Sequence, residues 1–200
     1  TWAMGVTQHR HSVATIREIS NFMFLRGNVG RPGTGLCPVR GHSNVQGDRT
    51  VGINERPPRA FLEALEKETG VAMPRRNGHN VLAALGAMSD GSAEAFIALG
   101  GNFVRATPDT PLVAAAMRKQ KLTVNIATKL NHSHLVPGEV SYVLPCLGRT
   151  EIDRNAKGVA QIVTVEDSMS MVHGSGGINK PASPELKSEV AIIAGIAAAT

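Results

Sequence analysis

The side chains best suited to chemistry lie in a glycine-rich stretch, residues 26–53. Its middle, residues 38–47 (PVRGHSNVQG), combines an arginine, a histidine, a serine and two amides. Arg40 offers a planar, permanently charged fork that binds a carboxylate or another oxyanion. His42 can donate a hydrogen bond or carry a proton near neutral pH. We expect Arg40 and His42 to be the catalytic or substrate-binding pair; a surface arginine and a structural histidine are the alternatives.

Other polar patterns in the sequence are weaker signs of a functional site than the 38–47 segment. Residues 30–35 (GRPGTG) lack the Lys-Ser/Thr of a P-loop and do not stand between a strand and a helix, so we expect no NTPase or dinucleotide motif there. His132 and His134 have no third ligand nearby in the sequence, which favours a surface loop over a metal pair. Cys146 follows an apolar run and is expected to be a small buried side chain.

The elements that must position these residues alternate between helix and strand. Continuous apolar strands separated by amphipathic helices predict an α/β fold: a mostly parallel open sheet with helices on both faces and a Rossmann-like topology. We expect helices over 12–26, 57–70, 80–88, 110–119 and from 183 onward, strands over 95–99, 122–127, 142–144 and 161–165, and a short strand or tight entry over 1–9. Residues 146–182 are predicted to be loop-rich.

Small and polar residues follow two of the predicted strands. Gly100 and Asn102 come directly after 95–99, and Asn125 lies near the end of 122–127. In an open α/β sheet, ligands bind beyond the carboxyl ends of the strands. We therefore expect both strand ends at one edge, with the turn at 100–102 holding a phosphate or a nucleotide.

The overall composition limits the classes of ligand and partner that this chain is expected to bind. Two hundred residues with 42% hydrophobic content fit one soluble domain of ordinary size or two very small ones, and we expect a single domain, 1–200. Two isolated cysteines fit a reducing, cytoplasmic compartment. The net charge of +5 favours anionic ligands. An aromatic content of 4%, without a long basic run, argues against nucleic acid, and no apolar run is long enough to span a bilayer. Because the chain starts at Thr1 and stops inside a helical pattern, we expect a fragment of a longer polypeptide.

A series of motifs resembles the central region of formate dehydrogenase-like molybdopterin oxidoreductases, in the dimethyl sulfoxide reductase superfamily. The resemblance covers essentially the whole chain and is strongest for the alpha subunits of that group. The motifs are, in order, residues 4–8 (MGVTQ), 27–33 (GNVGRPG), 38–47, 99–102 (LGGN), 143–145 (VLP) and 146–153 (CLGRTEID).

The resemblance implies a molybdopterin guanine dinucleotide carrying molybdenum or tungsten. It places Arg40 beside the metal, where it orients the substrate carboxylate. His42 stands where formate dehydrogenases usually carry glutamine. We therefore do not limit the expected substrate to formate: it is formate or a related small anion. The implied cofactor-binding residues are Met4, Gly5, Gln8, Gly100, Asn102, Thr107 and, more loosely, Asn125.

The resemblance also implies what this chain lacks. The iron–sulfur cysteines and the metal ligands of the family lie upstream, and the domain that completes the cofactor cage lies downstream. We therefore expect no metal ligand in this chain, and partners that comprise a small anionic substrate and the remaining domains of the same polypeptide, without nucleic acid or membrane. A stand-alone nucleotide-binding regulatory module without redox chemistry is the main alternative, and a nucleic-acid-binding protein is a third.

Overall fold

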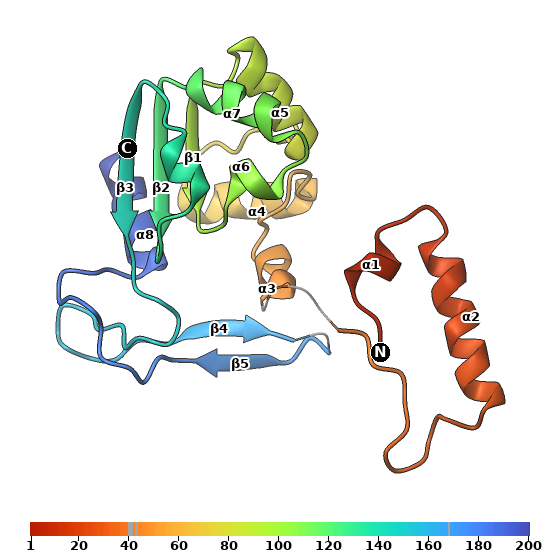
Figure 1. Ribbon diagram of the computed structural model, residues 1–200. Helices are drawn as coiled ribbons and strands as arrows, with labels where there is room; N and C mark the ends of the chain where they lie inside the picture. Colours follow the sequence, from red (N-terminus) through yellow and green to blue (C-terminus); the bar gives the residue numbers. More distant parts are fainter. Residues whose placement is uncertain (40–41, 43, 168) are drawn as a thin grey trace. The chain divides into compact units, whose positions relative to one another are not determined.

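The structure is a computed structural model that describes residues 1–39, 42, 44–167 and 169–200 (Figure 1). The chain forms two compact units. One comprises Thr1–Ile53 and Thr164–His173, and the other comprises Asn54–Val163 and Gly174–Thr200. The action of residues 1–200 as one cofactor-binding domain stays a prediction.

The second unit contains a parallel sheet of three strands in the order β1-β2-β3 (Figure 1). The strands are β1 (Ala95–Leu99), β2 (Leu122–Ala127) and β3 (Val140–Pro145). Asn125 of β2 is in register with Ala98 of β1 and Val143 of β3. The predicted α/β class, with its open parallel sheet, is confirmed.

Helices cover both faces of this sheet, as the alternation of side chains along β2 requires. Val124 and Ile126 point to the face covered by α8 (Glu189–Ala199), where Ile192 and Ile196 pack against them. Phe96 points to the other face, which carries the larger core. That core draws its buried residues from α5 (Val81–Asp90), α6 (Phe103–Ala106) and α7 (Thr110–Arg118): Leu85, Met88, Val104, Val113, Ala116 and Met117.

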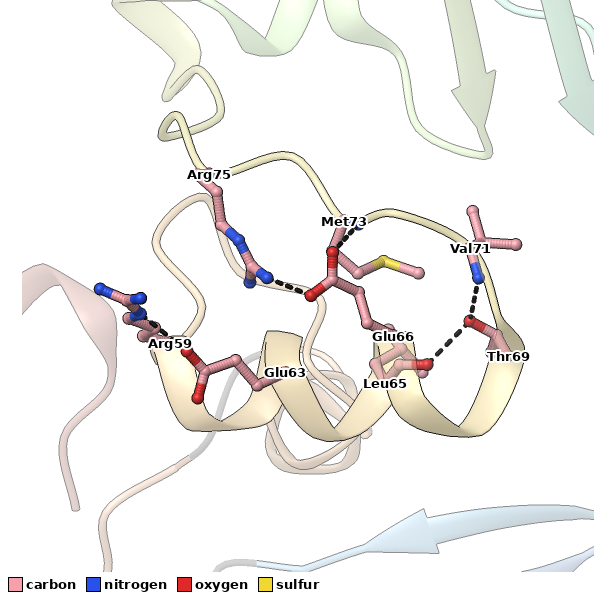
Figure 2. A network of polar contacts seen from close by, with 8 residues as sticks. All are labelled: Arg59, Glu63, Leu65, Glu66, Thr69, Val71, Met73 and Arg75. Atoms are coloured by element: carbon pink, nitrogen blue, oxygen red, sulfur yellow. Dashed lines mark hydrogen bonds and ion pairs between the residues drawn. The ribbon is translucent and has the colours of Figure 1, made fainter.

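The α4 helix (Arg59–Thr69) is held by polar contacts to the segment that follows it (Figure 2). Gly70 ends the helix in the left-handed conformation, with φ of 70°. The Glu66 carboxylate then accepts a hydrogen bond from the Met73 amide at 2.8 Å and pairs with Arg75. These contacts fold residues 70–75 back along the helix.

The first unit contains helices and part of a hairpin. Its helices are α1 (Met4–Thr7), α2 (Ser12–Leu25) and α3 (Val45–Thr50). Trp2 bridges to the segment around Pro38: the Trp2 amide donates to Cys37 O at 3.2 Å and the Val39 amide donates to Trp2 O at 2.7 Å. The strands β4 (Val163–Glu166) and β5 (Val172–Ser175) form a separate two-stranded sheet.

Several predicted boundaries are wrong, for local reasons. The strand predicted over 161–165 does not join the parallel sheet, because β4 alternates valine with Thr and Glu and pairs with β5 instead. Residues 4–7 form one helical turn rather than a strand. The helix predicted from 183 begins later, at Glu189, with Ser188 as its N-cap. The predicted starts at 12 and 110 agree with α2 and α7.

Within the described ranges, no helix is both long and apolar enough to cross a membrane.

Gly138 lies just before β3, and a substitution there can test the packing of the sheet. A Cβ at Gly138 would overlap the carbonyl oxygen of Gln120 and lie 3.2 Å from Thr123 Cγ2. We expect Gly138→Ala to lower the free energy of unfolding by about 1–3 kcal/mol, because a backbone atom has to move. Urea denaturation measures the change.

The matched control is Gly86→Ala, at an exposed position of α5 where a Cβ meets no heavy atom of the described residues within 4 Å. It should leave stability unchanged or raise it by up to about 1 kcal/mol, since alanine favours the helix. Equal effects of the two substitutions would contradict the packing described at β3.

Candidate functional site

The turn after β1 has an unusual backbone. Gly100 and Gly101 are both left-handed, with φ of 67° and 74°. The Gly100 amide still donates to Ile126 O at 2.8 Å, so the turn begins attached to β2. A Cβ at either glycine would meet no heavy atom of the described residues within 4 Å. Glycine is favoured here by the backbone angle, and the space beside the turn is open.

The turn also presents unused hydrogen-bond donors. Among the residues that the structure describes, the backbone amides of Gly101 and Asn102 have no hydrogen-bond partner. Neighbouring amides in a turn of this kind form a concavity that binds anions. The turn lies at the carboxyl edge of the sheet, where ligands of α/β proteins bind. This geometry suits an anionic group such as a phosphate.

Two residues after β2, Asn131 and Ser133, hold the turn through their side chains. Asn131 Nδ2 donates to Gly101 O at 2.7 Å. Ser133 Oγ donates to Asn102 Oδ1 at 3.0 Å and accepts from the Val104 amide at 3.1 Å. Ser133 is only 3% exposed, so these bonds are made inside the protein. The two strand ends are therefore joined by side chains, as well as by the sheet.

Sequence reasoning missed this network. Residues 131–134 were predicted to be a surface loop, but they form the 3₁₀ turn η1 (His132–Leu135), in which Ser133 is buried and His134 is half-buried. A usable signal was present, because Asn131 and Ser133 are small polar residues that follow an apolar strand. His134 Nδ1 accepts from the Asn131 amide at 3.0 Å, and its Nε2 is buried without a partner in the described part of the chain.

Thr107 and Asn125 are placed differently from the glycine turn. Thr107 ends α6 and is 7% exposed, while Asn125 lies within β2 and is 4% exposed. Both side chains therefore have little surface to offer a ligand, and their assignment as cofactor-binding residues stays a prediction. Gly100, Asn102 and Asn125 do share the carboxyl half of the sheet, as expected from their strands.

The remaining predicted site residues belong to the first unit. Met4 and Gly5 lie on α1 and Gln8 caps it, with all three exposed and Met4 at 44%. His42 is an exposed residue in a bend. Arg40 lies outside the described residues, so its predicted role is untested. Over the described ranges, no group of three or more His, Cys, Asp or Glu side chains gathers in a way that could hold a metal ion.

The segment after this loop is anchored to β4. Asn44 is left-handed, with φ of 70°, and its Oδ1 accepts from the Glu166 amide at 2.9 Å. Thr50 Oγ donates to Glu166 Oε2 at 2.6 Å. A Cβ at Gly47 would overlap Asn44 Oδ1, which explains one glycine of the 38–47 motif by packing. Glu166 is thus a structural anchor of α3 rather than a solvated strand end.

The hairpin next to Glu166 contains a second anchoring carboxylate. Asp167 Oδ2 lies 2.8 Å from His173 Nε2, and Asp167 Oδ1 accepts from the amides of Met169 and Met171 at 2.8 and 3.1 Å. The His173 hydrogen bond, followed by the two amides, holds the pKa of Asp167 below its ordinary value. These bonds close the turn between β4 and β5.

Cys146 is buried at 3% exposure, as predicted. Burial raises the pKa of its thiol, and the carboxylates of Glu189 and Glu151 raise it further. A thiol with a raised pKa is a poor nucleophile at neutral pH, so Cys146 serves the core beneath α8.

Comparison with known proteins found no matching family model. The chain is 55% identical over 198 residues to a Mycobacterium tuberculosis protein named uncharacterized oxidoreductase, covering 99% of this chain and 25% of that protein. It is 50% identical over 198 residues to protein YdeP of Escherichia coli, covering 99% and 26%. A Staphylococcus aureus protein named "Putative formate dehydrogenase" is 31% identical over 126 residues, which are 59% of this chain and 13% of that protein.

The chain thus spans about a quarter of the length of the curated relatives that it matches over nearly its full length. It is similar to a segment of proteins named oxidoreductases, which confirms the predicted resemblance at that level. The link to a protein named for formate is more distant. The molybdenum, the pterin cofactor and the substrate stay predictions.

The Asp167 hairpin gives a pH-dependent prediction. A carboxylate with a lowered pKa in the folded state stabilises the fold fully above its unfolded pKa of about 3.9, and this contribution is lost as the pH falls through the lower folded value. We expect the stability difference between wild type and Asp167→Asn to be constant above about pH 5 and to shrink in acid.

Urea titrations between about pH 2.5 and 6 follow this difference. Asp48→Asn, at an exposed aspartate of α3, is the control for the loss of one carboxylate. A wild-type advantage over Asp167→Asn that stays the same throughout this range would refute the role given to the carboxylate.

Proposed function

We propose that this chain is the cofactor-binding α/β part of a molybdenum-dependent oxidoreductase that resembles formate dehydrogenase. The turn at 100–102 would hold phosphate oxygens of a molybdopterin guanine dinucleotide. The observation that carries the proposal is the pair of left-handed glycines with open Cβ positions, followed by two backbone amides without a partner in the described ranges. The net charge of +5 agrees with an anionic ligand.

Each proposed residue has a separate task. The amides of Gly101 and Asn102 donate to phosphate oxygens. Met4, Gly5 and Gln8 on the exposed α1 turn offer a second contact region for the cofactor. The resemblance gives Arg40 the substrate carboxylate and His42 a proton or a hydrogen bond at the same substrate.

The residues present fit the nucleotide part of the cofactor better than its metal. Backbone amides and open glycines accept a pyrophosphate without a side-chain rearrangement. When bound, the molybdenum centre supplies two-electron chemistry, while the chain binds and orients cofactor and substrate. We propose that the metal ligands and any iron–sulfur cluster come from other parts of a longer polypeptide. The isolated 200 residues should therefore not oxidise formate.

The proposed substrate is formate or a related small anion. Support for formate comes from the name of one distant relative and from the motif resemblance. A nucleotide-binding regulatory module without redox activity would use the same turn. The relatives named oxidoreductases favour the redox assignment over that alternative.

The test is the cofactor content of the longer protein that we propose contains this segment. Molybdenum and acid-released GMP should copurify in comparable amounts, measured by elemental analysis and chromatography. Gly101→Val should lower both at least about fivefold, because a branched side chain at positive φ costs about 1–2 kcal/mol and fills the space beside the amides.

The matched control is Gly91→Val. Gly91 is also left-handed, with φ of 84° and an open Cβ position, but it caps α5 away from the carboxyl edge of the sheet. This variant should lose similar stability and keep its cofactor. A wild-type protein without molybdenum but with bound nucleotide would favour the regulatory module, and a protein with neither would refute the proposal.

A further inference from the structure

We infer that Ser133 positions the side-chain amide of Asn102 so that its Nδ2 group donates a hydrogen bond to the bound nucleotide. The inference rests on the proposed nucleotide site and adds to it the orientation of the Asn102 side-chain amide. Asn102 would supply a side-chain donor, and Ser133 would act only through Asn102.

The orientation of the Asn102 side-chain amide follows from the hydrogen bonds that Ser133 makes. The Val104 amide can only donate, and it donates to Ser133 Oγ at 3.1 Å. The single hydroxyl hydrogen of Ser133 is then free to be donated, and it points to Asn102 at 3.0 Å. In the structure this hydrogen is donated to Oδ1 of Asn102, so Oδ1 faces Ser133. The Nδ2 group is therefore turned away from Ser133.

Burial shields the two hydrogen bonds of Ser133 Oγ from water. Val104 is 0% exposed and Ser133 is 3% exposed, so water cannot readily replace either bond. Asn102 itself is half-buried. A flipped amide would instead donate from Nδ2 to Ser133 Oγ, leave the Ser133 hydroxyl hydrogen without its acceptor and turn Oδ1 toward the ligand. That state costs a buried hydrogen bond.

Asn131 fixes the backbone of the same turn from the same segment. Its Nδ2 group donates to Gly101 O at 2.7 Å, while its Oδ1 accepts from the Ser133 amide at 2.9 Å. The carbonyl of Gly101 is thereby held toward η1. The turn is thus fixed at both a backbone and a side-chain atom by residues about 30 positions further along the chain.

The arrangement selects the chemistry of the ligand group. A fixed NH₂ beside two amide donors suits an oxygen that only accepts, such as that of a phosphate. A hydroxyl or an ammonium group would gain less. This is consistent with a pyrophosphate at the turn, and it assigns Asn102 a contact that its backbone alone does not make.

The experiment measures binding of GDP to the 200-residue chain by calorimetry and by ¹H–¹⁵N NMR. In wild type, GDP should shift the side-chain NH₂ resonances of Asn102. Asn102→Ala should weaken binding at least about tenfold, as expected when a hydrogen bond to a charged group is lost. Ser133→Ala should weaken it as well, while Ser133→Thr retains the hydroxyl and Ser141→Ala, at an exposed serine of β3, should have no effect.

The double variant separates positioning from general stability. If Ser133 acts through Asn102, combining Asn102→Ala with Ser133→Ala should weaken binding no more than Asn102→Ala alone. Additive losses, or wild-type affinity in Asn102→Ala, would overturn the inference and leave the proposed function standing. Absence of GDP binding in wild type would count against the nucleotide site itself, and the inference would fall with it.

Hydrogen exchange gives an independent reading without a ligand when the Val104 amide is compared with the Gly100 amide, which donates to Ile126 O and not to Ser133. The Val104 amide should be protected in wild type and in Ser133→Thr, and should exchange faster in Ser133→Ala. Unchanged exchange in Ser133→Ala would contradict the hydroxyl bridge on which the orientation of Asn102 depends.

Discussion

Two consecutive left-handed residues decide what the edge of this sheet can do. Gly100 and Gly101 turn the chain away as soon as β1 ends, and the amides of Gly101 and Asn102 have no hydrogen-bond partner among the described residues. The space beside the Cβ positions of both glycines is open. A side chain at either position would strain the backbone and occupy that space. The other features of the site, including the fixed carbonyl of Gly101 and the held side chain of Asn102, depend on this turn.

The sheet makes the turn rigid. β2 is the central strand, and its residues Thr123–Ile126 are buried between the two layers of helices. Its register places the end of β1 beside Ile126, and the chain after β2 returns through η1 to reach the same turn. Burial of apolar side chains on both faces thus determines where a small polar network can form. A network supported in this way holds a ligand-binding turn better than a free loop does.

Local patterns in the sequence predicted much of the fold. The apolar runs predicted β1, β2 and β3, and Asn80 and Gly70 were correctly expected at helix ends. The bonds that join distant segments were not predictable from spacing. Ser133 meets Asn102 across 31 positions and Asn44 meets Glu166 across 122, and neither pairing leaves a periodic pattern. The role of Arg40 still depends on the resemblance alone.

The proposed site at the turn after β1 is tested most directly by the place where a nucleotide phosphate binds. A crystal structure of the chain with GDP would locate it. We expect the phosphate oxygens to contact the backbone amides of Gly101 and Asn102 and the Nδ2 group of Asn102. Phosphates bound elsewhere, with these three donors facing solvent, would contradict the account.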